Sequence, residues 1–356
     1  MINKKLNLII ITFAFLIINF FSFILMSPHD KSVEIAACKL DCAWYMGIAK
    51  NGYSESAITE GIDDLGEANW AFFPAYPLLV RFVSYITTIN YHVSGLLVNY
   101  TLWPFLVFLC IRNLSAKNIH VNEILFCLAL SVYPLNVWYF SQYSEALYGV
   151  LLIFSVILLR ENKVNLSALF CCILSLARPT GFFMTIGLAL WWLYKNRNQN
   201  GLRDSLLLIV SGGFGLSLFV LYLSSKIGDG FAFSHVQIAW GREFKVFPFH
   251  ILNNLYNHIH TTSTYIAIFT IFLSILMFFY GWRLESFLVG LTIIIACSTG
   301  VKSIGRIVFA NPLTIEFLAY IFVILNKNIR YFLFFLLAFL HFIVIYFWIY
   351  GYKFLE

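Results

Sequence analysis

Residues 38–77 read CKLDCAWYMGIAKNGYSESAITEGIDDLGEANWAFFPAYP, one of the few long polar stretches in the chain. The stretch follows a hydrophobic run at 6–26 and ends in an aromatic segment with two prolines, which excludes an ordinary helix interior there. Asp41 lies near its start, beside Trp44 and Tyr45. We therefore expect the working surface of the protein to form around this stretch.

Composition identifies the broad class of protein. The chain has 356 residues, of which 61% are hydrophobic and only 11% are charged, and it contains 38 Phe. A soluble globular protein is about 25% charged and about 45–50% apolar. A membrane protein with many spans is the class that fits. The net charge of +6 must first be divided between the two sides of the membrane, so it does not predict a nucleic-acid partner.

Eleven apolar runs are long enough to be spans, at about 20 residues each with allowance for burial inside a bundle. They are 6–26, 94–111, 122–140, 143–159, 164–178, 180–194, 205–224, 263–281, 286–301, 307–325 and 331–350. The first run has no small-residue cleavage site, so we expect a retained first span. The segment 72–90 contains Arg81 and two prolines, and we expect an interfacial or re-entrant helix.

The sequence therefore predicts an all-α polytopic membrane protein with a single domain over 1–356. Lys and Arg dominate the short loops on one side, which predicts that those loops are cytoplasmic. The two long loops, 27–93 and 225–262, then lie on the outer face. No GxGxxG or GxxxxGK[ST] nucleotide-binding fingerprint is present, so the inner loops carry no expected nucleotide site.

Several polar candidates fall on the predicted outer side. Asp41 is either a solvated loop carboxylate or, if partly buried, a usable base. Glu145 follows a tight turn and complements a helix dipole. Arg178 either snorkels to the interface or binds a phosphate. Lys302 and Arg306 add positive charge at the outer end of a predicted span.

Aromatic and amide side chains form a second group of candidates. The segment around AFFPAYP (71–77) is either an interfacial aromatic belt or a platform for a lipid tail. Its candidate substrate-binding residues are Asn69, Trp70, Phe72, Phe73 and Tyr76. In the second long loop, GDGFAFSHVQIAWGR (228–242), the plausible contacts are Gln237, Trp240 and Arg242.

Several other acidic, histidine and cysteine residues have a structural interpretation as well as a functional one. Asp63, Asp64 and Glu67 would suit a divalent cation, although a solvated acidic loop is the preferred interpretation. No zinc site is predicted, because the histidines lack helical metal-ligand spacing. Cys38 and Cys42, at i,i+4, are expected to be two small residues and not a disulfide. Glu316 lies within a predicted span, where pairing with a buried Arg is expected.

The sequence resembles the PIG-V family of GT-C glycosyltransferases over most of its length. The resemblance is carried by LDCAWYMGIAKNGY (40–53), NWAFFPAYPLLVR (69–81), YSEALYGVLL (143–152), LARPTGFF (176–183), GDGFAFSHVQIAW (228–240) and SIGRIVFANPL (303–313). It implies a GT-C-like bundle of about 11 transmembrane helices with interfacial helices in the first outer loop. The active site would face outward, and a bacterial inner membrane is expected in preference to the endoplasmic reticulum.

The resemblance also implies partners and roles. The donor would be dolichyl- or undecaprenyl-phosphate mannose, and the acceptor a lipid or glycolipid. Asp41 matches the family's acidic residue after the first span and would be the catalytic base. Arg178, Arg306 and Lys302 would neutralise the donor phosphate. Asn69, Trp70, Phe72, Phe73, Tyr76, Glu145, Gln237 and Trp240 would contact substrates. No cofactor is required by this scheme, although a divalent cation stays an option.

Two other classes of protein compete with an enzyme. A lipid-linked sugar transporter or flippase predicts paired broken helices and polar residues at the membrane midplane. We find no internal repeat, and only Glu316 favours that alternative. A structural membrane subunit would leave Asp41, Arg178 and Arg306 without a chemical role.

Overall fold

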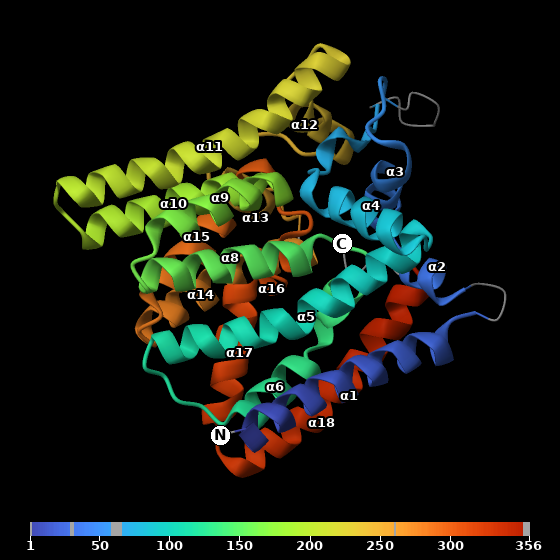
Figure 1. Ribbon diagram of the computed structural model, residues 1–356, viewed down its shortest axis with the longest axis vertical. Helices are drawn as coiled ribbons and strands as arrows, with labels where there is room; N and C mark the ends of the chain where they lie inside the picture. Colours follow the sequence, from blue (N-terminus) through green and yellow to red (C-terminus); the bar gives the residue numbers. More distant parts are fainter. Residues whose placement is uncertain (1, 29–31, 58–65, 260, 352–356) are drawn as a thin grey trace.

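A computed structural model describes residues 2–28, 32–57, 66–259 and 261–351, and these residues form helices and loops with no sheet (Figure 1). The first half of the chain contains α1 (Ile2–Met26), α2 (Val33–Ala37), α3 (Cys42–Asn51), the 3-10 helix η1 (Asn69–Ala71), α4 (Ala75–Thr87), α5 (Tyr91–Ala116), α6 (Glu123–Ser131), η2 (Pro134–Asn136), α7 (Val137–Phe140) and α8 (Glu145–Arg160). The second half contains α9 (Val164–Ala177), α10 (Pro179–Lys195), α11 (Gln199–Ile227), α12 (Ala232–His235), η3 (Val236–Trp240), α13 (Phe249–Tyr256), α14 (Thr262–Phe279), α15 (Arg283–Thr299), α16 (Ile304–Phe309), α17 (Pro312–Ile324) and α18 (Lys327–Ile349).

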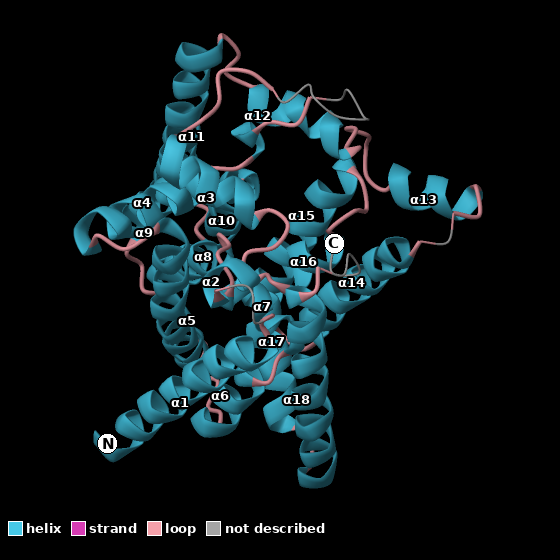
Figure 2. Ribbon diagram, turned by 90° about the vertical axis from the view of Figure 1, so that its right-hand side faces the viewer, coloured by secondary structure: helices cyan, strands magenta, loops and turns pink. Residues whose placement is uncertain are grey.

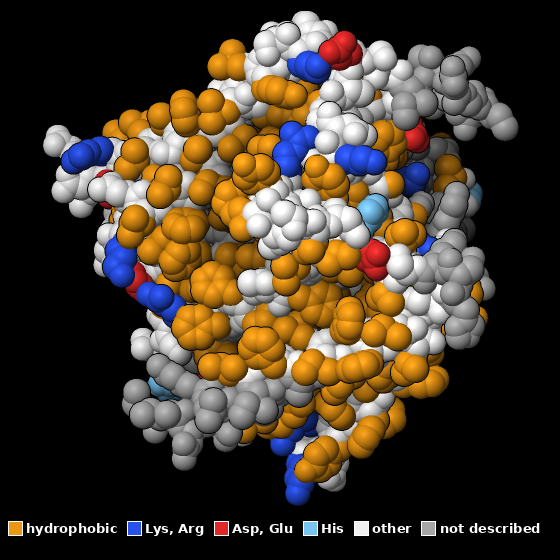
Figure 3. All heavy atoms as spheres, turned by 45° about the vertical axis from the view of Figure 1, so that its right-hand side comes forward, with side chains coloured by type: hydrophobic (Ala, Val, Ile, Leu, Met, Phe, Trp, Pro, Cys, Tyr) orange, Lys and Arg blue, Asp and Glu red, His pale blue; other side chains and the backbone are white. Residues whose placement is uncertain are grey.

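Several long apolar helices indicate a multi-pass membrane protein. Among the described residues, α5, α11, α14 and α18 are long and apolar enough to cross a membrane. A fifth span results if α6 and the η2–α7 segment, which are bent by 70°, are counted together. Large apolar side chains are exposed along these helices, and hydrophobic atoms cover most of the face in Figure 3. Such a surface fits lipid better than water.

The run 122–140 is not the continuous helix that its apolar composition predicts. Helix α6 ends at Ser131, and the chain turns before Pro134. Proline cannot donate a helical hydrogen bond and its ring clashes with the preceding turn. The Asn136 side chain donates to the carbonyls of Leu130 and Ser131, which satisfies the broken end of α6. The segment 72–90 contains the short helix α4, which is not among the helices long and apolar enough to cross a membrane (Figure 2); its interfacial placement stays a prediction.

The helices pack as a bundle in which sequence neighbours lie side by side. Helices α5, α8, α9 and α11 follow one another across the molecule, and α10 packs on α9, α11 and α15 (Figure 1). Small residues of α11 in the segment SGGFG (211–215) permit this close approach. A Cβ on Gly215 would lie 2.1 Å from the Cys172 carbonyl oxygen, and one on Gly212 would lie 2.3 Å from Thr185 Oγ1.

The ionisable residues gather at two opposite ends of this bundle. Helix α8 begins at Glu145 and ends at Arg160, and its 16 residues rise about 24 Å. At the Arg160 end, Glu285 is buried and contacts Arg160 Nη2 at 2.6 Å and Lys117 Nζ at 3.1 Å. The Glu316 carboxylate accepts hydrogen bonds of 3.0 and 2.9 Å from Asn113 Nδ2, so its direct partner is an amide and not the expected Arg.

We predict that Glu285→Ala strongly destabilises the protein. The substitution would leave Lys117 and Arg160 without their shared buried carboxylate, and breaking a buried ion pair costs about 3–5 kcal/mol. Glu161→Ala is the matched control, because Glu161 pairs with Arg112 and Lys163 at a site open to solvent, where an ion pair contributes less than about 1 kcal/mol. Equal losses of melting temperature for both variants in detergent would contradict the prediction.

Candidate functional site

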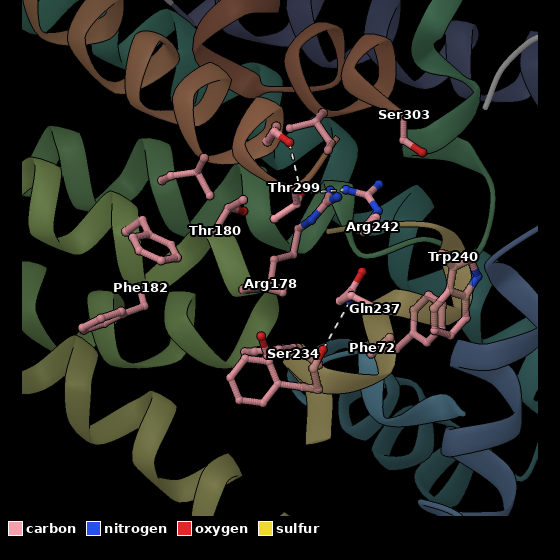
Figure 4. A pocket seen from close by; sticks show the side chains of 18 of the residues that line it. Phe72, Arg178, Thr180, Phe182, Ser234, Gln237, Trp240, Arg242, Thr299 and Ser303 are labelled. Carbon is pink, nitrogen blue, oxygen red and sulfur yellow. Dashed lines mark hydrogen bonds between the residues drawn. The ribbon is translucent and has the colours of Figure 1, made fainter. Parts of the chain in front are cut away.

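A cavity of about 580 Å³ opens at the Glu145 end of α8, between the two long loops (27–93 and 225–262) and the helices α10, α15 and α16 (Figure 4). Nine of the residues predicted for the site line it: Asp41, Phe72, Phe73, Arg178, Gln237, Trp240, Arg242, Lys302 and Arg306. These residues come from segments separated by up to 265 positions in the sequence. The fold therefore brings most of the predicted polar and aromatic candidates into one site.

Asp41 is held at the polar end of the cavity by Arg306. The Arg306 guanidinium forms an ion pair with Asp41 Oδ2, and the two side chains are 16% and 24% exposed. Among the described residues, no hydrogen bond reaches the other carboxylate oxygen of Asp41. Asp41 directly precedes α3, but its side chain makes no capping hydrogen bond to that helix, so the ion pair with Arg306 is what orients the carboxylate. The site thus presents an oriented, partly exposed carboxylate to the cavity.

Glu145 supports this pair from behind. Its carboxylate is 1% exposed, lies 2.7 Å from Arg178 Nη1 and 3.7 Å from Arg306 Nε, and is the first residue of α8. The positive end of the helix dipole adds to the stabilisation of this buried charge. Burial alone would lower the pKa of Arg306, but the carboxylates of Asp41 and Glu145 raise it above its usual value. Glu145 therefore positions two guanidinium groups without itself lining the cavity.

Arg242 is a cation that these carboxylates do not compensate. Its guanidinium donates to Thr299 Oγ1 at 3.4 Å and to the Lys302 carbonyl at 3.3 Å, both neutral acceptors. Burial, together with the positive charge of Arg306, lowers its pKa to about 10, so it is still charged at neutral pH. Figure 4 shows Arg178 and Arg242 pointing toward the same part of the cavity.

The balance of charge in the site is positive. Among the described residues that line the cavity, Arg178, Arg242, Lys302 and Arg306 are cations and Asp41 is the acid, with Glu145 behind it. Guanidinium groups bind phosphate and carboxylate oxygens through paired hydrogen bonds. The polar end of the cavity is therefore suited to an anionic group.

Aromatic side chains form one wall. The Trp44 and Phe72 rings stack with centroids 5.8 Å apart, and Trp240 meets both rings edge-on at 6.0 Å. Tyr45 lies beside Phe72 and exchanges a hydrogen bond of 2.9 Å with Ser144. Burial raises the pKa of Tyr45 to about 12, so its phenol stays neutral. These ring contacts connect the two long loops, 27–93 and 225–262, next to Asp41.

The opposite part of the cavity is apolar. Its lining there comes from α10, α11, α15 and the loop before α12: Phe182, Phe183, Leu216, Phe231, Ile294 and Ile295. Phe183 and Ile294 are 39% and 44% exposed, on helices whose outer surface is apolar. A cavity with cations at one end and an apolar exit at the other fits an amphipathic molecule with an anionic head.

Besides Glu145, three predicted substrate contacts lie outside the cavity lining, so the prediction that these four residues line the site is wrong; the other three support the segments that build it. The Asn69 amide accepts from the Ser54 N–H and donates to the Gly52 carbonyl, at 3.1 and 3.2 Å. Trp70 Nε1 donates to the Ser54 carbonyl at 2.8 Å. The fully buried Tyr76 donates to the Gly95 carbonyl at 3.3 Å.

Cys38 and Cys42 form a disulfide, so the expectation of two unpaired small residues is wrong. The i,i+4 argument assumed that both residues lie on one helix. Cys38 instead follows α2 in extended conformation, and Cys42 begins α3. Between them Leu40 adopts a left-handed conformation, with φ 53°, which closes the turn. The other described cysteines are Cys110, Cys127, Cys171, Cys172 and Cys297, and all of these are free.

Other candidates give no site of their own. Asp63 and Asp64 lie outside the described residues, and the cation alternative for that loop stays a prediction. Tyr143, Thr299 and Phe182 contribute to the site but were not singled out individually, because each lies within or next to an apolar run. Phe182 and Tyr143 could have been found from the stretches that carry the family resemblance, because both residues lie in them.

We predict that Arg242→Gln weakens binding of inorganic pyrophosphate, used as a probe anion, by about tenfold or more, since a hydrogen bond to a charged group contributes about 1.5–3 kcal/mol. Binding can be followed as the rise in melting temperature with anion concentration. Arg197→Gln is the control, because Arg197 lies after α10 at the opposite end and stacks on Tyr194. Equal anion stabilisation in wild type and both variants would contradict an anion site at Arg242.

Comparisons with known proteins add no assignment to this geometry. No known protein family matches the chain, and a search of curated proteins gives no significant match. The function has to be inferred from the chemistry of the cavity.

Proposed function

We propose that the protein is an integral membrane glycosyltransferase that moves a sugar from a polyprenyl-phosphate donor to a lipid or glycolipid acceptor with inversion. The observation that carries the proposal is the amphipathic cavity in which Asp41 lies beside Arg178, Arg242 and Arg306. A carboxylate, a surplus of guanidinium groups and an apolar exit match the three parts of this reaction: acceptor hydroxyl, donor phosphate and lipid tail.

The proposed chemistry needs one base and several cations. Asp41 takes the proton of the acceptor hydroxyl as its oxygen attacks the anomeric carbon of the sugar. The bond from that carbon to the phosphate oxygen breaks, and the polyprenyl phosphate leaves with the electron pair. A phosphate needs no general acid, because guanidinium groups already in place stabilise its charge. Arg178, Arg242 and Arg306 supply that charge, with Lys302 at the rim.

The remaining lining residues fit the rest of the two substrates. The apolar residues of α10, α11 and α15 accommodate the first part of the polyprenyl tail at the lipid-facing exit. The Phe72–Trp240 wall and Gln237 offer a stacking surface and an amide for the sugar or the acceptor. Mannose is proposed as the sugar on the family resemblance alone.

Two observations support an outer-face site. The cavity lies at the end of the bundle opposite to Lys117, Arg160 and Lys163, whose loops are predicted to be cytoplasmic. The Cys38–Cys42 disulfide adjoins Asp41, and disulfides persist in oxidising compartments such as the periplasm or the secretory lumen. We propose that the shorter apolar helices join the longer ones to make about eleven spans of a GT-C-like bundle in a bacterial inner membrane.

The resemblance to the PIG-V family is consistent with the same site. Each stretch that carries it contributes a residue to the cavity or to the ion pairs behind it, for example Asp41, Phe72, Glu145, Arg178, Gln237 and Arg306. Chance similarities would not be expected to converge on one place in the fold.

We predict that Asp41→Asn lowers kcat for sugar transfer by about a hundredfold or more, the usual scale of general-base catalysis. The assay uses radiolabelled polyprenyl-phosphate mannose and host lipid extract with purified protein in liposomes. The matched control is Glu55→Gln, an acid of the same outer loop that pairs with Lys226 away from the cavity and should leave transfer unchanged.

The possible outcomes separate the two classes of protein. Full transfer by a folded Asp41→Asn variant would remove Asp41 as the base. If wild type binds the donor and moves it across the liposome membrane without any transfer, the flippase alternative replaces the transferase.

A further inference from the structure

The turn that carries Asp41 is closed by a covalent bond. The disulfide joins Cys38 to Cys42, so Asp41 belongs to a five-residue ring with a Cα–Cα separation of 5.2 Å at its ends. Inside the ring Leu40 has φ 53°, a left-handed conformation that residues with a branched or bulky side chain rarely adopt. The ring therefore holds the backbone before Asp41 in a conformation that an open chain would leave readily.

Tyr143 also holds this turn in place, through hydrogen bonds to its backbone. Its hydroxyl accepts a 2.9 Å hydrogen bond from the Asp41 N–H and donates one of 2.8 Å to the Lys39 carbonyl. Tyr143 is 1% exposed, and its ring lies 5.6 Å from the Arg306 guanidinium. One buried phenol thus holds the backbone on both sides of Leu40 and contacts the cation that pairs with Asp41.

The disulfide can be reached from a second cavity. This space of about 740 Å³ lies against the face of α3 that carries Ala43, Met46 and Gly47, and its lining includes Cys38, Lys50 and His92. Cys38 is half-buried, whereas Cys42 is fully buried. The cysteine sulfurs and a ring nitrogen of His92 lie within 4.8 Å of one another. A small thiol can therefore approach Cys38 without entering the substrate cavity.

We propose that the Cys38–Cys42 disulfide is a positioning element for Asp41 and makes the activity dependent on the thiol redox state. The inference rests on the proposed transferase function. With the ring closed, the carboxylate is held against Arg306. With the ring open, Leu40 relaxes, the contacts of Tyr143 loosen, and Asp41 leaves its position relative to the acceptor hydroxyl.

The switching chemistry is ordinary thiol–disulfide exchange with a dithiol as reductant. One thiolate attacks the Cys38 sulfur from the second cavity, and the Cys38–Cys42 bond breaks with its electron pair on Cys42, which takes up a proton. The second thiol of the reductant then attacks the mixed disulfide, so that Cys38 is released as a thiol and the reductant is oxidised to its own disulfide. Two electrons and two protons reach the protein. Lys50 lines the same cavity as Cys38, and its positive charge favours the thiolate forms during this exchange.

The proposal predicts that reduction of the disulfide lowers kcat and leaves the KM for the donor nearly unchanged. Arg178, Arg242 and Arg306 belong to other elements of the fold, so donor binding and the KM for the donor should change little on reduction. A displacement of the base by about 1 Å can lower the rate by about a hundredfold, so kcat should fall by at least about tenfold.

The experiment compares oxidised, dithiothreitol-treated and re-oxidised wild type in liposomes, with maleimide mass tagging to confirm that two thiols appear beyond the five free cysteines. We expect kcat to fall on reduction and to return on re-oxidation, while Cys38→Ser/Cys42→Ser has the low kcat throughout. Cys172→Ser, which removes a half-buried free thiol elsewhere, should respond as wild type does. An unchanged kcat in protein shown to be reduced would overturn the inference.

A second readout is independent of sugar transfer. Hydrogen–deuterium exchange of the peptide covering 38–45 should quicken on reduction, and exchange in α8 should not. If oxidised wild type transfers no sugar but exchange in this peptide still quickens on reduction, the transferase proposal fails, whereas the proposal that the disulfide holds the Asp41 turn stands. If exchange in this peptide does not quicken in protein shown to be reduced, the proposal that the disulfide holds the turn is wrong.

Discussion

The contact on which the site depends is the charge network of Asp41, Arg306, Glu145 and Arg178. Charges removed from water must be paired at close range, because the cost of desolvation amounts to several kcal/mol for each ion. Glu145, fully shielded at the start of α8, lies against both arginines, and Arg306 in turn reaches Asp41. Four elements distant in sequence are thereby held in one arrangement, and Arg242 remains as the cation with neutral partners only.

This network explains why the two ends of the bundle differ. In the buried cluster at the Arg160 end, two acids, Glu285 and Glu316, are matched by two cations, Lys117 and Arg160, and none of these four residues lines either of the two cavities described above. At the Asp41 end, cations exceed acids and face an open space with an apolar exit. The buried cluster at Glu285 has equal numbers of acids and cations and holds helices together. The cluster at Asp41 has more cations than acids and lies beside a cavity, so it is suited to bind an anion.

The sequence could predict the helices but not all of their breaks. Apolar runs such as 143–159 and 180–194 coincide with α8 and α10, because hydrophobic length is a direct requirement of the membrane. Pro134 indicates a break in this run, but the bend also depends on hydrogen bonds from the Asn136 side chain to carbonyls at the end of α6, and the sequence does not predict those bonds. The disulfide was missed because its geometry requires Leu40 in a left-handed conformation. Tyr76 and Phe72 look alike in sequence, and only packing puts one in the core and the other on the cavity wall.

The most direct measurement is a cryo-EM structure of the protein in lipid nanodiscs with polyprenyl-phosphate mannose bound. We expect the phosphate among Arg178, Arg242 and Arg306, the anomeric carbon on the Asp41 side of it, and the tail leaving between the apolar residues of α10 and α15. A head group lying midway between the two charged ends, or on the lipid-facing surface away from Asp41, would contradict the proposed active site.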